Sequence, residues 1–118
     1  MFDITYNIEF ARCEQLQEIP TTIANMTCLD WLGFDGCKAL CVGHACFETF
    51  KALKTLGFGG CELLEKLPHG LGKLASLEKL YLNGCKELKI EDADFACLTS
   101  LTTLNLQGVS NYKRFQQP

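Results

Sequence analysis

The chain has 118 residues, a hydrophobic fraction of 47% and a net charge of −3, which together fit one folded domain and exclude a disordered chain. Acidic and basic residues are interspersed, so no basic stripe points to a nucleic acid as partner. No apolar run approaches the roughly 20 residues that a membrane-spanning helix needs, so we expect no membrane insertion either.

A period of 24 residues runs along most of the chain and is marked by four cysteines, Cys13, Cys37, Cys61 and Cys85. Apolar residues lie five and three positions before each of these ladder cysteines, and a leucine lies three positions after it. The leading position, eight residues before the cysteine, holds Thr5 in the first copy and leucine in the others. A period in the twenties indicates stacked coils that bury their apolar faces against one another. We therefore predict a single domain, residues 1–118, with repeats at about 5–28, 29–52, 53–76 and 77–100 and a partial repeat at 101–118.

Each repeat is expected to begin with a short strand and to return through turns. In the fourth repeat, Leu80-Tyr81-Leu82 alternates inward leucines with an outward tyrosine, which is strand periodicity. A glycine before each ladder cysteine of the second to fourth repeats suits a tight turn, and the thiol can then donate to a backbone carbonyl. Ile19-Pro20 and Leu67-Pro68 precede apolar residues at spacings of three, which indicates 3₁₀ or short helical turns. The second and fourth repeats lack this proline.

The pattern Leu-x-x-Leu-x-Leu-x-x-Cys-x-x-Leu resembles the leucine-rich repeat in its cysteine-containing variant, over residues 5 to about 109. The resemblance implies an α/β fold: a right-handed leucine-rich-repeat solenoid, or horseshoe, with a parallel β-sheet on the concave face and 3₁₀ or short helical turns on the convex face. Residues 67–77 are also similar to repeats of plant intracellular immune receptors and of algal leucine-rich families. In those receptors the repeats sense ligands or pathogen proteins, but this chain has no G-x-x-x-x-G-K-S/T nucleotide-binding loop.

The eight cysteines are expected to be reduced. The ladder cysteines follow the repeat and are predicted to pack as buried rungs of the stack, while the other four fall at different points of the frame. Such spacing favours thiols in an intracellular compartment over a disulfide framework. The first residues also lack the basic and long apolar segments of a secretory signal. We therefore expect an intracellular protein, in the cytoplasm or an organelle interior.

In leucine-rich repeats the outward strand positions form the usual binding face, so the resemblance places a partner site there. Trp31 is the only tryptophan, and the register directs it toward solvent near tyrosines and mixed charges, which is typical of a protein-binding hot spot. Gly33 and Gly57 leave a shallow trough that could accept a partner, unless Trp31 lies across them and covers the backbone. The candidate partner-binding residues are Trp31, Tyr81, Lys79, Lys54, Tyr6, Glu9, Asn105, Gly33 and Gly57.

Catalytic and metal-binding signals are weak. His44 lies between Cys41 and Cys46, and His69 comes one coil later at nearly the same frame position, so these four could form a zinc site of Cys₂His₂ type. The Cys-x-x-His-x-Cys spacing is not that of a standard zinc finger, and scattered surface residues are the simpler interpretation. No serine, cysteine or lysine has a recognisable activating partner. We expect no enzyme activity, no cofactor and no bound metal.

The expected function is a non-catalytic protein–protein interaction module that binds its partner through the concave face. One alternative is a structural or scaffold subunit of a larger assembly, held through its ends, because neither end has the polar composition of a capping repeat. Another alternative is a sensor-domain fragment of a plant-type immune receptor within a longer array. Because one scaffold of this kind serves many ligands, the partner's identity does not follow from the repeats.

Overall fold

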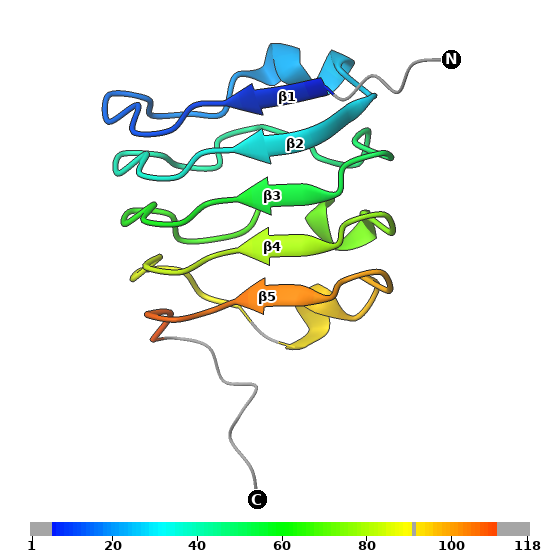
Figure 1. Ribbon diagram of the computed structural model, residues 1–118. Helices are drawn as coiled ribbons and strands as arrows, with labels where there is room; N and C mark the ends of the chain where they lie inside the picture. The colour runs from blue at the N-terminus through cyan, green and yellow to red at the C-terminus, as the bar shows by residue number, and fades with distance from the viewer. Residues whose placement is uncertain (1–5, 91, 111–118) are drawn as a thin grey trace, which may run out of the picture.

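Five short parallel strands form a single sheet, with one strand in each 24-residue unit (Figure 1). The computed structural model describes residues 6–90 and 92–110, so the predicted leading residue Thr5 and the end of the partial repeat, 111–118, lie outside the described residues. The spatial order of the strands is their order in the chain. The strands are β1 (Tyr6–Glu9), β2 (Leu29–Gly33), β3 (Thr55–Gly57), β4 (Lys79–Tyr81) and β5 (Thr103–Asn105).

The register of the sheet follows the 24-residue period. From β2 to β5, Trp31 pairs with Thr55, Thr55 with Lys79 and Lys79 with Thr103. The leucines one position further on in β2, β3 and β4 are fully buried, which confirms the predicted alternation of inward and outward side chains. The pairing shifts at the start of β1, where Tyr6 lies opposite Leu29 instead of Asp30.

Short 3₁₀ turns complete the units on one side of the sheet: η1 (Thr21–Asn25), η2 (Leu71–Lys73) and η3 (Asp92–Phe95) (Figure 1). The described residues contain no long helix and none that is long and apolar enough to cross a membrane. The second unit has an extended return segment in place of a 3₁₀ turn, with Ala45 and Phe47 buried on alternate positions. Two isolated parallel bridges, Glu18 with Cys41 and Cys46 with His69, join this segment to its neighbours.

Thiol-to-carbonyl hydrogen bonds join successive units, as the ladder cysteines led us to expect. Each buried thiol donates to the carbonyl oxygen of a phenylalanine 27 residues earlier. The donor–acceptor pairs are Cys37 with Phe10 at 3.1 Å, Cys61 with Phe34 at 3.2 Å, and Cys85 with Phe58 at 3.0 Å. The prediction that Cys13 is a buried rung is wrong: Cys13 is exposed, because no described residue packs over the outer side of the first unit.

The turn before each ladder cysteine has the left-handed backbone that glycine adopts at low cost. Gly36, Gly60 and Gly84 have φ values of 79°, 75° and 80°. Arg12 occupies the same place in the first unit with φ 62°, and it is the only residue other than glycine with positive φ in the described part of the chain. A left-handed conformation costs a residue with a side chain about 1–2 kcal/mol, and glycine avoids this free-energy cost at the turns of the inner units.

A column of aromatic rings forms the centre of the core. The Phe10 and Phe34 rings stack at a centroid distance of 5.1 Å, and the Phe34 and Phe58 rings at 5.3 Å. Phe47, from the return segment of the second unit, stacks on Phe58 at 6.4 Å. Leu82 continues the column in the fourth unit and is fully buried. Phe58 therefore contacts rings from both the strand side and the return side of the core.

Replacing Phe58 by alanine should destabilise the fold by about 3–5 kcal/mol, because the change removes a buried ring and leaves a cavity. The measurement is the free energy of unfolding in urea. Leu63→Ala serves as the control, since Leu63 is 55% exposed and its truncation should change stability by no more than about 0.5 kcal/mol. Equal losses in the two variants would contradict this account of the core.

The buried thiols should resist alkylation in the folded protein. Burial raises the pKa of Cys85 to about 11 and raises the pKa values of Cys37 and Cys61 as well. Because the thiolate is the reactive form, iodoacetamide at neutral pH should label these three far more slowly than the exposed Cys28 and Cys97. Mass spectrometry of peptides from the native protein measures the difference, and urea should abolish it. Uniform labelling without urea would show that the ladder is open to solvent.

Candidate functional site

The outward side chains of β1–β5, which we call the strand face, contain most of the predicted partner-binding residues. Trp31 on β2 is 44% exposed, as its register predicted. Its indole Nε1 donates a hydrogen bond to Glu9 Oε1 on β1 at 3.1 Å. Lys54 and Lys79 are exposed on the β3 and β4 side. Further along the face, Tyr81 and Asn105 are half-buried.

The trough expected at Gly33 and Gly57 is filled by carboxylates. A Cβ atom on Gly33 would overlap Oε1 of Glu9, and a Cβ atom on Gly57 would lie 2.9 Å from Oδ1 of Asp35. Both glycines are buried beneath these side chains. The expectation of an open trough is therefore wrong, because acidic side chains from the preceding unit are long enough to reach across. Trp31 covers Gly33 only indirectly, through the hydrogen bond that holds Glu9 in place.

Asp35 was absent from the predicted site but organises the middle of the strand face. Its Oδ1 accepts a hydrogen bond from the backbone N–H of Gly59 at 2.8 Å, and Gly59 is buried. Asp35 and Gly59 are 24 residues apart, so the repeat places an aspartate carboxylate beside a glycine amide in the next unit. That pairing is the sequence signal that could have identified Asp35.

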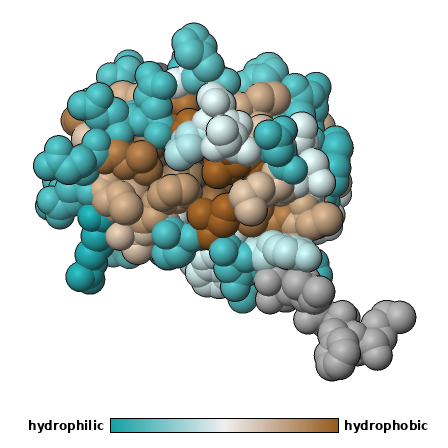
Figure 2. All heavy atoms as spheres, turned by 90° about the horizontal axis from the view of Figure 1, so that it is seen from above, coloured by the Kyte–Doolittle hydropathy of each residue, from teal (hydrophilic) through white to brown (hydrophobic). Residues whose placement is uncertain are grey.

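Tyr6 belongs to the β1 end of the molecule. Its side chain is 46% exposed and, with Met26 and Leu29, lines a groove of about 220 Å³. Figure 2 views this end and shows apolar residues gathered in its middle, bordered by hydrophilic ones. The shifted pairing of Tyr6 with Leu29 accounts for this position. The structure thus divides the predicted partner-binding set between the strand face and an apolar patch at the β1 end.

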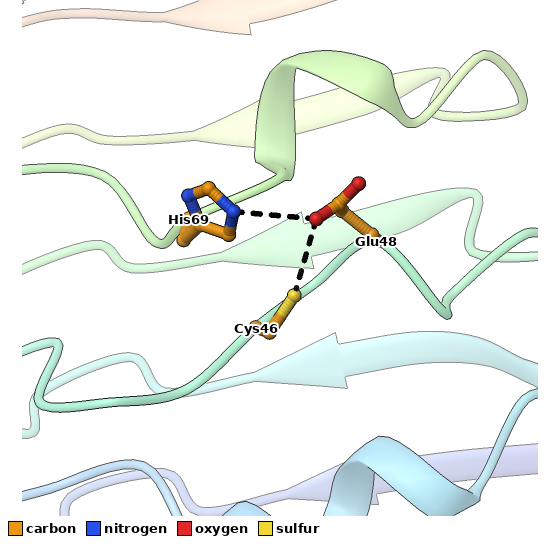
Figure 3. A group of neighbouring side chains, drawn as sticks. All are labelled: Cys46, Glu48 and His69. Atoms are coloured by element: carbon orange, nitrogen blue, oxygen red, sulfur yellow. Dashed lines mark hydrogen bonds and ion pairs between the residues drawn. The ribbon is translucent and has the colours of Figure 1, made fainter.

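A separate group of polar side chains lies on the return segments, where Cys46, Glu48 and His69 converge (Figure 3). Glu48 Oε2 lies 3.2 Å from His69 Nε2 and accepts a hydrogen bond from the Cys46 thiol at 3.6 Å. The structure therefore brings together two of the four residues that the sequence suggested for zinc. Cys41 and His44 lie outside the group, and the amide of Cys41 instead donates to Gln17 at 2.8 Å.

Glu48 is the member of this group that the sequence did not suggest. Its Oε1 is 3.1 Å from Lys73 Nζ, and this ammonium, with a smaller contribution from the Cys46 thiol, holds the pKa of Glu48 below its ordinary value. The sequence feature that could have identified Glu48 is the alternation around Phe47. Because Ala45 and Phe47 point inward, Cys46 and Glu48 both point outward.

No protein-family model, no curated protein and no solved structure matches this chain.

Removing the Asp35 carboxylate should leave the buried Gly59 amide without a hydrogen-bond acceptor. Asp35→Ala should cost about 1–3 kcal/mol in unfolding free energy, because the Gly59 N–H loses its acceptor in a buried position. Asp35→Asn is the matched variant: its side-chain oxygen can still accept that bond, so most of the stability should remain. Urea denaturation of the three proteins measures the effect. If the asparagine variant lost as much stability as alanine, the charge and not the hydrogen bond would be the stabilising feature.

Proposed function

We propose that this chain is a leucine-rich-repeat solenoid of the cysteine-containing type that acts as a non-catalytic protein-binding module. In such a solenoid the strand face is the concave surface that receives the partner. The parallel sheet with a constant step of 24 residues and the thiol-to-carbonyl bonds between units support the solenoid. The binding role rests on the side chains that this stacking holds toward solvent.

The observation that carries the proposal is the exposed Trp31. Its backbone is paired on both sides, with Asn7 of β1 and Thr55 of β3, and its indole donates a hydrogen bond to Glu9. A partner that covers this ring would gain a large apolar contact, and the hydrogen bond to Glu9 lowers the entropy cost of ordering the side chain. Tryptophan in such a setting is among the residues most often dominant in protein interfaces.

Charged side chains of both signs border the strand face. Glu9 and Asp35 place carboxylates over β1–β3, while Lys54 and Lys79 alternate with the exposed Glu78 beside β3 and β4. A partner with charged groups of both signs would complement this surface. The half-buried Tyr81 lies next to Lys79 on β4 and extends the contact.

A second candidate, the subunit held through its ends, is favoured by the apolar patch at the β1 end. Ile8 and Phe10 in the first unit are only partly buried, whereas the equivalent Leu32 and Phe34 in the second unit are fully buried. Met26, 42% exposed, adds to this surface. An association that covers this patch would bury side chains whose counterparts elsewhere are core residues.

A photo-crosslinking amino acid tests the proposal. Placed at Asn7 or Thr103 on the strand face, it should capture one defined protein in extracts of the native source, identified by mass spectrometry. Placed at Leu63, which is exposed away from the strands, it should not. Adding Trp31→Ala or Lys79→Ala to the crosslinking variant should weaken capture by about tenfold or more, the scale expected when an interface anchor is lost.

The outcome also separates the two candidates. Capture that survives Trp31→Ala but is lost with Met26→Ser would contradict binding at the strand face and favour association through the β1 end. Circular dichroism of each variant checks that the fold is intact, which the exposure of both side chains leads us to expect.

A further inference from the structure

We propose that Cys46, Glu48 and His69 bind a zinc ion with an open fourth position. This site is distinct from the strand face, and its existence does not depend on the proposed protein-binding function. Thiolate, imidazole and carboxylate are the three ligand types that zinc takes from proteins. Magnesium and calcium prefer sites made wholly of oxygen ligands, so the mixed set favours a borderline ion over a hard one.

Two of the three distances between ligand atoms match the edges of a zinc tetrahedron. Zinc–ligand bonds of about 2.3 Å to sulfur and about 2.0 Å to oxygen and nitrogen give edges of about 3.5 Å for S···O and about 3.3 Å for N···O. The corresponding distances to Glu48 Oε2 are 3.6 Å from Cys46 Sγ and 3.2 Å from His69 Nε2. Cys46 Sγ and a ring nitrogen of His69 lie within 4.8 Å of one another, so zinc binding would draw these two groups closer together.

The backbone under these ligands is held in place. Cys46 and His69 form an isolated parallel bridge, and the N–H of the buried Phe47 donates to the His69 carbonyl at 2.7 Å. Gly70, with φ 84°, lies beneath Glu48, and a Cβ atom at this position would overlap the Glu48 side chain. Because residue 70 is glycine, the Glu48 side chain has enough space at this position. Its carboxylate points toward both Cys46 and His69 (Figure 3).

The groups around the site carry charge of both signs, because Glu48 is paired with the Lys73 ammonium. Lys73 occupies Oε1 of Glu48 at 3.1 Å, which orients the carboxylate and leaves Oε2 facing Cys46 and His69. When the zinc–sulfur bond forms, the Cys46 thiol releases its proton to solvent, and the resulting thiolate and the Glu48 carboxylate offset two of the three positive charges of zinc and Lys73. The His69 side chain is 75% exposed, so a hydrated ion can enter and keep a water as its fourth ligand.

Titration of the full chain tests this site. The protein is prepared with a non-thiol reductant and without chelator, then titrated with zinc chloride against a chromophoric zinc chelator. We expect one ion per chain. Binding should also raise the melting temperature, because the site joins the second and third units only in the folded state. Cobalt chloride should give a thiolate-to-cobalt charge-transfer band together with the intense visible bands of four-coordinate cobalt.

Matched variants locate the ion. Cys46→Ala, Glu48→Gln and His69→Ala should each weaken zinc binding by more than about tenfold, the loss typical even of groups that only orient a ligand. Cys41→Ala and His44→Gln change the same residue types in the same segment but outside the cluster, so they should leave affinity unchanged.

The proposal is overturned if zinc does not bind, or if the cobalt spectrum lacks the thiolate band. It is equally overturned if the Cys41 or His44 variant loses as much affinity as the three cluster variants. Binding that persists in all three cluster variants would place the ion on other exposed cysteines and would also contradict the site. Magnesium chloride at the same concentrations should neither compete with zinc nor raise the melting temperature.

Discussion

The hydrogen bond from a buried thiol to the carbonyl of the preceding unit is the constraint on which the stacking depends. At the end of β2, the Phe34 carbonyl accepts both the Cys37 amide at 3.0 Å and the Cys61 thiol at 3.2 Å. Both lone pairs of a buried oxygen are thereby satisfied, one within the unit and one from the next. Without the thiol the carbonyl would keep the amide of its own unit but lose its bond to the next unit, and such a bond contributes about 0.5–1.5 kcal/mol net.

Both surfaces of interest depend on contacts between neighbouring units. On the strand face the step of 24 residues aligns Glu9 with Gly33, and the glycine leaves space that the carboxylate fills while it also accepts the Trp31 hydrogen bond. On the return segments the step is shorter: Cys46 pairs with His69, and Gly70 lies beside Glu48. In each case a small residue in one unit accommodates an acidic side chain from the unit before. The proposed interaction surface and the proposed zinc site therefore use the same kind of contact between units at different places.

The success of prediction from sequence differed between these two surfaces. The outward position of Trp31 followed from strand alternation, because neighbouring residues in a strand must point to opposite faces. Asp35 and Glu48 were not predicted, since their importance depends on how far a side chain reaches into the adjacent unit. The prediction of an open trough at Gly33 and Gly57 was wrong for the same reason. A glycine indicates space beside the backbone, but the neighbouring unit determines which side chain fills that space.

The sequence by itself determined the period, the strand in each unit, the inward and outward positions and the donation by the ladder thiols. These features depend on residue type and spacing along one chain, which periodicity reports directly. Tertiary structure alone decided that Cys13 is exposed, that Tyr6 lies at the β1 end, and that Glu48 joins Cys46 and His69 while Cys41 and His44 do not. Those outcomes depend on what packs over a unit and on side-chain reach between units. A one-residue shift in pairing or an unoccupied neighbouring position changes them without changing the repeat.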